Sequence, residues 1–299
     1  MQNRIQDENL QAMGLMARLL QADQPLFTPE EVQSFARDTG LEAPDAFRLL
    51  IAAALGLAPD ENEAHRRLYR AYFLPALSRL MPGEYAADPY YQLLDNVQLQ
   101  QGGWQLTRQR YAPYQVFPCG NTRLLPDGRT VPRLGFFETG FSYPALLENG
   151  REWMTVTPGE IETMRADIAA AQGRALVLGL GLGYFAYMIS QKPEVKSVTV
   201  IERSASVIAL FRDHLLPLFP HGDKLTLIRA DALRWLDAAS APFPYNFVYA
   251  DLWHDVADGV PLYLELQKRQ ARLGGDWHFW IEPDMAIFLG GLAADPAFK

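Results

Sequence analysis

The sequence predicts an α/β protein with a doubly wound, mostly parallel sheet, preceded by an N-terminal helical segment and a small antiparallel β region. Three observations support this prediction. After residue 158, apolar runs alternate with amphipathic stretches, as in parallel strands covered by helices on both faces. Residues 96–157 contain short alternating runs broken by hairpin dipeptides, and the preceding residues have apolar side chains at helical spacing. We therefore expect three regions, residues 1–95, 96–157 and 158–299.

Composition indicates a globular protein and argues against several classes of function. The 299 residues are 49% hydrophobic and 21% charged, which allows a large core and more than one domain. A net charge of −8 without a basic run disfavours a nucleic-acid partner. The one cysteine, Cys119, forms neither an intrachain disulfide nor a cysteine-rich zinc site. With no apolar signal segment and no run long enough for a membrane span, we expect a cytoplasmic protein that has no membrane partner.

One helix of the N-terminal segment has a complete start signal. In LFTPEEVQSFA, Thr28 is placed as the N-cap, Pro29 lies in the first turn and Glu31 closes a capping box, while Phe27 faces Val32 as a hydrophobic staple. Apolar residues at helical spacing continue through DAFRLLIAAALGLA and EAHRRLYRAYFLPALSRL. We expect a helical cap or dimerisation layer, with a partner-binding helical module as the alternative.

Three dipeptides in the β-rich region predict hairpin turns: Gly102-Gly103, Asp127-Gly128 and Asn149-Gly150. They separate candidate strands rich in aromatic residues, which favours a small antiparallel sheet. Aromatic residues in strands usually pack in a core, and lining a substrate pocket is the alternative.

A second helix start signal opens the last region, with Thr157 as cap, Pro158 at the first helical position and Glu160 three residues after the cap; we expect Gly173 to end this helix. Beyond it, strands and helices alternate through ALVLGL, YFAYMISQ, SVTVIE, ASVIALFRDHLLPLF, KLTLIRA, ALRWLDAA, YNFVYAD, LYLELQKRQARLG and WHFWIE. We expect a break at Pro283 after the fifth strand, so that the sheet either stops early or is closed in an unusual way.

Three alternating glycines, Gly179, Gly181 and Gly183, follow the first strand of this region in RALVLGLGLGYFAYMIS. In a doubly wound sheet this strand-to-helix turn lies under a ligand, and glycine allows both a tight turn and a close approach to the main chain. A tight turn without a ligand is the alternative. Tyr184 stands where the dinucleotide fingerprint requires glycine, which counts against a pyrophosphate cofactor.

The next two strand ends supply acidic residues. Glu202 ends the strand in SVTVIER, where its carboxylate can accept hydrogen bonds from both hydroxyls of a ribose. Asp231 follows the strand in LTLIRADALRWL, where it can accept from the exocyclic amine of adenine. Each could instead be a helix N-cap or a solvated loop residue.

Taken in order, VLGLGLGYFA, VTVIERSASVIALF, LTLIRADALRWL and YNFVYADLWHD resemble the core of the class I S-adenosylmethionine-dependent methyltransferases, and among these the spermidine-synthase-like branch. The resemblance covers about residues 158–282 and implies a Rossmann-like domain that binds S-adenosylmethionine (SAM). It implies that the glycine turn contacts the methionine part of the cofactor, the second strand end contacts the ribose and the third strand end contacts the adenine. The cofactor contacts implied at these positions and at the fourth strand end are Gly179, Leu180, Gly181, Gly183, Tyr184, Glu202, Arg203, Asp231, Ala232 and Asp251.

Two positions depart from the family pattern. Val177 stands where methyltransferases commonly have an acidic residue, two positions before the first glycine. Leu182 stands where aminopropyltransferases commonly have an aspartate inside the turn. Either loss removes an expected partner for the ammonium group of the cofactor.

The fourth strand end, in YNFVYADLWHDVADG, holds the candidate catalytic residues. Transfer of a methyl or aminopropyl group from a sulfonium needs an aligned nucleophile and often a base, and Asp251 or His254 can be that base. Alternatively, these residues orient the substrate or organise the loop. Asp251 also resembles the first position of the D-x-x-D type motif of aminopropyltransferases, with His254 in the second and Asp255 one residue late. The set lacks a recognisable metal-ligand pattern, so we predict no metal.

We therefore predict a SAM-dependent methyltransferase that acts on a small molecule. A homodimer is the assembly that we consider for it. The alternatives are an aminopropyltransferase that uses decarboxylated SAM and a non-catalytic protein that binds SAM or a related nucleoside. The sequence does not identify the acceptor.

Overall fold

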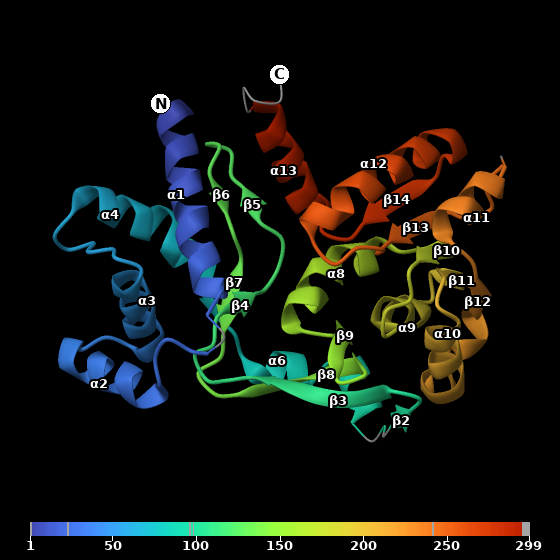
Figure 1. Ribbon diagram of the computed structural model, residues 1–299, viewed down its shortest axis with the longest axis horizontal. Helices are drawn as coiled ribbons and strands as arrows, with labels where there is room; N and C mark the ends of the chain where they lie inside the picture. Colours follow the sequence, from blue (N-terminus) through green and yellow to red (C-terminus); the bar gives the residue numbers. More distant parts are fainter. Residues whose placement is uncertain (1, 23, 96, 98, 241, 295–299) are drawn as a thin grey trace. The chain divides into compact units, whose positions relative to one another are not determined.

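The computed structural model describes residues 2–22, 24–95, 97, 99–240 and 242–294 (Figure 1). The chain is a mixed α/β protein that divides into two compact units, and each unit is assembled from separate segments. The first comprises residues 1–88, 108–143 and 158–160, and the second comprises residues 89–107, 144–157 and 161–299. The three-region division made from the sequence stays a prediction.

The first unit begins with helices, as expected from the sequence: α1 (Gln2–Leu20), α2 (Pro29–Thr39), α3 (Ala43–Ala54), α4 (Glu63–Leu68), the π-helical turn η1 (Tyr69–Phe73), α5 (Leu74–Ala76) and α6 (Pro82–Ala86). The predicted capping box is confirmed, since Glu31 N donates to Thr28 Oγ1 at 3.3 Å and Thr28 N donates to Glu31 Oε2 at 2.8 Å. Val32 is buried in the core of this unit, and Phe27 packs against the same core.

One short strand interrupts the segment that we expected to be helical. β1 (Leu77–Arg79) pairs in parallel with β7 (Leu134–Phe136), which also pairs antiparallel with β4 (Phe117–Pro118). The partner strand lies more than fifty residues away in sequence, so helical spacing before it could not reveal this pairing. The hairpin predicted at Asp127-Gly128 is confirmed by the antiparallel pair β5 (Arg123–Leu124) and β6 (Thr130–Val131).

A four-stranded sheet contains the other two predicted hairpins, in the order β2 (Leu99–Gln101), β3 (Trp104–Tyr111), β8 (Phe141–Glu148) and β9 (Arg151–Thr155). β2 and β3 pair antiparallel across Gly102-Gly103, and β8 and β9 pair antiparallel across Asn149-Gly150. The indoles of Trp104 and Trp153 meet edge to face with ring centroids 5.3 Å apart, which is the packing role expected of strand aromatics.

The second unit contains the predicted parallel sheet, with strands in the order β12-β11-β10-β13-β14 (Figure 1). Its strands are β10 (Gly173–Leu178), β11 (Val195–Glu202), β12 (Leu225–Arg229), β13 (Phe247–Ala250) and β14 (Asp276–Phe279). The helices around them are α7 (Pro89–Leu94), α8 (Pro158–Ala170), α9 (Tyr184–Ser190), α10 (Ala205–Leu210), α11 (Ala232–Ala238), α12 (Val256–Leu273) and α13 (Glu282–Ala294), with short π and 3₁₀ turns η2 (Phe211–Leu215), η3 (Leu216–Leu218) and η4 (Gly222–Lys224).

Helices lie against both faces of this sheet. Leu176 and Val248 belong to a core cluster that includes buried residues of α11, α12 and α13. On the other face, Phe185 of α9 stacks on Tyr249 with ring centroids 3.7 Å apart. Successive residues of a strand point to opposite faces, so strands that are apolar throughout are what a sheet covered on both sides requires.

Two helix boundaries differ from the prediction. α8 ends at Ala170, and Gly173 instead begins β10, because its N–H donates to Glu194 O at 2.8 Å in the connection to β11. Pro283 lies in the first turn of α13 and does not break the chain, since a proline N–H is not needed in that turn. Within the described residues, the parallel sheet has five strands and the chain continues into a helix.

Candidate functional site

The predicted site residues gather at the carboxyl ends of four neighbouring strands of the parallel sheet. From β10 the chain adds β11 and β12 on one side, and then returns to add β13 and β14 on the other. The turn after β10 and the loop after β13 therefore flank the point where the strand order reverses, which is where open α/β sheets bind ligands. The Asp251 N–H donates to Leu178 O at 2.9 Å, and the Gly179 N–H donates to Ile201 O at 2.9 Å.

Two glycines of the turn are required by neighbouring protein atoms. Both have positive φ, 95° at Gly179 and 84° at Gly183, a region that favours glycine. A Cβ on Gly179 would lie 2.0 Å from the carbonyl oxygen of Asp251, and one on Gly183 would lie 2.2 Å from Cε2 of Phe211. These contacts account for both glycines whether or not a ligand binds.

Gly181 is less crowded. A Cβ at this position would meet the terminal methyl carbon of Met154 at 3.2 Å, and that side chain is flexible. Gly181 is therefore the glycine of the turn at which a larger residue can be accommodated by movement of a side chain, although its φ of 52° still favours glycine.

Glu202 anchors the glycine turn to the end of β11. Its carboxylate is buried, with Oε2 accepting from the N–H of Leu180 at 3.2 Å and Oε1 accepting from the N–H of Ser204 at 2.7 Å. A carboxylate has about four acceptor positions, so each oxygen keeps room for another donor. The ribose contact stays a prediction, and the anchoring role was not anticipated.

Asp231 forms the N-cap of α11, the alternative considered for this residue. Its Oδ1 accepts from the N–H of Arg234 at 3.0 Å, and the side chain is exposed at the sheet edge. The next residue, Ala232, is buried, and Arg203 on the neighbouring strand end is exposed. Their predicted contacts with the cofactor stay predictions.

Asp251 combines burial with an unpaired carboxyl. Burial raises its pKa to about 7 against the opposing effect of His254, and among the described residues the carboxyl takes part in no hydrogen bond or ion pair. The group is partly buried rather than exposed. Near neutral pH it is therefore present in both protonation states and can accept or release a proton.

His254 and Asp255 lie at the start of α12. The Asp255 side chain accepts from the N–H groups of Ala257 and Asp258, and the Asp255 N–H donates to Asp258, which completes a capping box. The His254 side chain is 86% exposed, and its Nδ1 lies 3.1 Å from Oδ2 of Asp258. The observed hydrogen bonds of this cluster are those of a helix cap, and the catalytic role of His254 stays a prediction.

Several turn residues face the protein interior. Leu180, Leu182 and Tyr184 are buried, and the Tyr184 ring meets Tyr90 of α7 edge to face with centroids 5.5 Å apart. The Tyr90 hydroxyl donates to the carbonyl of Leu182 inside the turn. Sequence reasoning missed Tyr90, because no local pattern indicates a contact between residues 92 positions apart.

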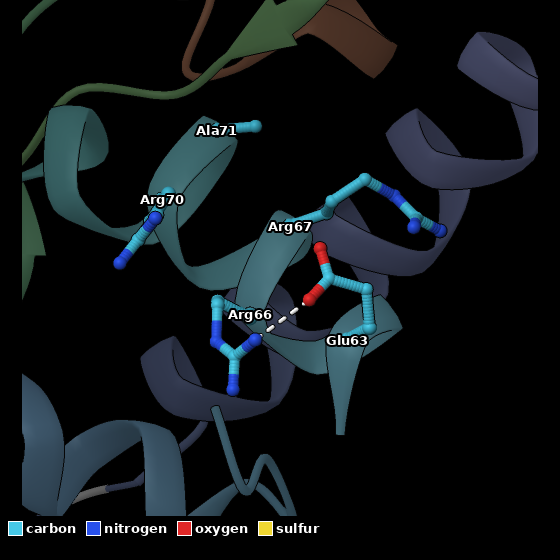
Figure 2. A pocket seen from close by; sticks show the side chains of 5 residues that line it. All are labelled: Glu63, Arg66, Arg67, Arg70 and Ala71. Atoms are coloured by element: carbon cyan, nitrogen blue, oxygen red, sulfur yellow. Dashed lines mark hydrogen bonds and ion pairs between the residues drawn. The ribbon is translucent and has the colours of Figure 1, made fainter. Parts of the chain in front are cut away.

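A separate pocket of about 240 Å³ lies in the first unit and is lined by residues of α4 and η1: Glu63, Arg66, Arg67, Arg70 and Ala71. Figure 2 shows that the three guanidinium groups point in different directions, and Arg66 Nη1 is paired with Glu63 Oε2 at 2.7 Å. The arginines thus do not converge on one point, and none of the predicted site residues lines this pocket.

Within the described ranges, no group of three or more histidine, cysteine, aspartate or glutamate side chains is placed to hold a metal ion. In that same part of the chain, no helix combines the length and apolar composition needed to span a membrane.

No protein-family model and no curated protein matches the chain. Many solved structures are similar to parts of it, among them the following three. Precorrin-8w decarboxylase of Methanobacterium thermoautotrophicum is 20% identical over 42% of this chain and 63% of that chain, with a TM-score of 0.32. A conserved hypothetical protein of Streptococcus pyogenes is 17% identical over 35% and 62%, with a TM-score of 0.28. Spermidine synthase in complex with the transition state analogue AdoDATO is 16% identical over 37% and 40%, with a TM-score of 0.28. Two of the three are named enzymes, and the chain spans less than two thirds of the length of each structure.

Proposed function

We propose that this protein is an enzyme whose second unit is a Rossmann-like domain that binds SAM and transfers its methyl group to a small-molecule nucleophile. One observation carries the proposal. Asp251, whose carboxyl has a pKa of about 7 and no hydrogen-bond partner among the described residues, has its main-chain carbonyl against Gly179 of the glycine turn, where the strand order reverses. A proton acceptor next to a ligand-binding turn is what transfer to a protonated nucleophile requires.

The residues at the sheet edge suit a ligand that is rich in hydrogen-bond donors. Glu202, Asp231 and Asp251 end or follow β11, β12 and β13, which lie on the two sides of β10, and an ionised carboxylate only accepts hydrogen bonds. The ribose hydroxyls, the adenine amino group and the ammonium group of SAM are all donors. The free acceptor positions on Glu202 support a ribose contact, and those on Asp231 support an adenine contact.

When bound, SAM supplies an electrophilic methyl carbon on a sulfonium, whose loss leaves a neutral thioether. Asp251 takes the proton that the acceptor nitrogen or oxygen loses as it bonds to that carbon, and the carbon–sulfur electron pair stays on sulfur. Glu202 ties the glycine turn to β11 through the N–H of Leu180, and the Asp251 N–H donates to Leu178 O, just before the turn.

Aminopropyl transfer has less support from the site. The second acidic residue of the D-x-x-D type motif would have to be Asp255, and the carboxylate of Asp255 caps α12. We therefore propose methyl transfer and keep decarboxylated SAM as an arm of the test.

The first prediction is that the purified protein binds SAM and S-adenosylhomocysteine in a calorimetric titration, and binds decarboxylated SAM and NAD more weakly. Asp251→Asn should still bind SAM, because it keeps the side-chain shape and one acceptor oxygen. In a subsequent screen of cationic amines as acceptors, the same variant should lose methyl transfer by roughly 100-fold or more.

Stronger binding of decarboxylated SAM would instead favour aminopropyl transfer. Binding of NAD alone, or of no nucleoside, would contradict the assignment of the glycine turn to SAM.

A further inference from the structure

Two adjacent tyrosines of α7 donate their hydroxyls to main-chain carbonyls in different segments of the second unit. Tyr90 donates to the carbonyl of Leu182, in the glycine turn, and Tyr91 donates to the carbonyl of Val156, before α8, at 2.5 Å. Both side chains are buried. The two residues thus make the same kind of bond from the same helix, but only one of these bonds reaches the predicted cofactor site.

The surroundings of Tyr90 hold its ring in place. Its side chain is fully buried, and its ring centroid lies 5.5 Å from Tyr184, 5.3 Å from Tyr187 and 6.4 Å from Phe219. Aromatic rings packed on several sides in this way leave little room for another rotamer. The hydroxyl is therefore delivered to a constant position at the turn.

The bond from Tyr90 fixes a peptide plane of the turn. The carbonyl of Leu182 and the N–H of Gly183 belong to one planar peptide group and point in opposite directions. The carbonyl accepts from Tyr90, and the N–H donates to Leu180 O at 2.8 Å. With both ends bonded, this peptide cannot rotate without losing two hydrogen bonds.

The opposite end of the turn is held separately. The Leu180 N–H donates to Glu202 Oε2, so the turn is tied to β11 on one side and to α7 on the other. A binding loop that is already held in its bound shape loses less conformational freedom when the ligand arrives.

We propose that Tyr90 is a positioning residue for SAM binding, whose hydroxyl holds the glycine turn in its binding conformation before the cofactor arrives. The inference rests on the proposed function, because it assigns the turn to SAM. It places a determinant of cofactor affinity in the segment before the parallel sheet, outside the sequence motifs that suggested the site.

The test compares Tyr90→Phe with Tyr91→Phe by calorimetric titration with SAM and with S-adenosylhomocysteine, together with thermal unfolding of each variant. Each change removes one buried hydroxyl that is bonded to a carbonyl, so both should lower the melting temperature. Only Tyr90→Phe should also weaken nucleoside binding, by about 3- to 10-fold relative to Tyr91→Phe, the effect of one net hydrogen bond.

Equal affinities of the two variants, with a wild type that binds SAM, would overturn the role of Tyr90 and leave the proposed function standing. A wild type that binds neither nucleoside would overturn the proposed function, and this inference with it.

Hydrogen exchange on the wild type covers the case in which Tyr90→Phe fails to fold. The Gly183 amide should exchange as slowly as the amides of β10 in the nucleoside-free protein, and adding SAM should change its rate by less than about twofold. Rapid exchange that SAM slows would show that the ligand, and not Tyr90, organises the turn, and would overturn the inference.

Discussion

At the level of single residues, the acidic side chains at the sheet edge differ in how their burial is compensated. Glu202 is buried, but two main-chain N–H groups donate to its carboxylate. Asp231 is exposed and accepts one N–H. Asp251 is partly buried, and its carboxyl accepts no hydrogen bond from any residue that the structure describes, so desolvation raises its pKa to about 7. Of these acidic residues, Asp251 is the one whose raised pKa lies near neutral pH.

The raised pKa of Asp251 predicts a loss of stability as the pH rises. Between its ordinary value of 3.8 and about 7 the folded state holds the proton more tightly than the unfolded state, so stability falls across this range and is lowest above it. Asp251→Asn removes this dependence. When the pH is raised from 5 to 8.5, the free energy of unfolding of the variant should increase relative to that of the wild type by on the order of 2 kcal/mol.

Thermal or urea unfolding of both proteins at these two pH values measures this difference. Asp231→Asn is the matched control, because its carboxyl is exposed. A stability gap between Asp251→Asn and the wild type that does not change with pH would contradict the raised pKa.

At the level of elements, helix ends and one side-chain bridge link neighbouring segments of the second unit. The capping box at the start of α12 uses both Asp255 and Asp258, next to the loop that carries Asp251. His278 of β14 bridges two carboxylates, with Nδ1 2.8 Å from Asp167 Oδ1 on α8 and Nε2 3.4 Å from Asp276 Oδ2. Asp255 and Asp258 thus stabilise the start of α12, and the edge strand β14 is tied to α8.

The cap of α12 predicts a modest loss of stability in Asp255→Ala. Removing the acceptor leaves the N–H groups of Ala257 and Asp258 without their side-chain partner, at a cost of about 1 kcal/mol. Urea unfolding measures the loss, and Asp255→Asn, which can still cap, should keep most of the stability. If SAM binding is unchanged in Asp255→Ala, the residue acts only through the helix; a large loss of binding would contradict a purely capping role.

The bridge at His278 predicts a second pH dependence of stability. Its hydrogen bond to Asp167 raises the pKa of His278 above the ordinary 6.5, with a smaller contribution from Asp276. The stabilisation is fully present below pH 6.5 and is lost as the pH rises through the raised pKa of the folded state. His278→Gln should therefore lose more stability at pH 6 than at pH 9.

Urea unfolding at the two pH values checks this prediction for the bridge. His221→Gln, at an exposed histidine, serves as the control. Equal losses at pH 6 and pH 9 in His278→Gln would show that the bridge does not depend on charge.

At the level of the whole molecule, local sequence patterns predicted whether a segment is a helix or a strand better than they predicted which segment it pairs with. The parallel sheet, its helices and the three hairpins were predicted because each depends on a run of neighbouring residues. The strand β1 was missed, because its partner β7 is distant in sequence. The position of Gly173 in β10 was missed for the same reason, since its hydrogen-bond partner Glu194 is also distant in sequence. The error at Pro283 was local, because proline is tolerated in the first turn of a helix and we expected a break there.

By itself, the sequence determined which residues stand at the carboxyl ends of the strands, since alternating apolar runs and turn residues locate those ends along the chain. It placed the glycine turn, Glu202, Asp231 and Asp251 at one edge of one sheet. Only the tertiary structure decided the surroundings of each residue: the carbonyl against Gly179, the amides on Glu202, the hydroxyl of Tyr90 on Leu182 and the burial of the Asp251 carboxyl. The physical reason is that hydrogen bonds and burial depend on atoms brought together across the fold, and no local pattern records which atoms those are.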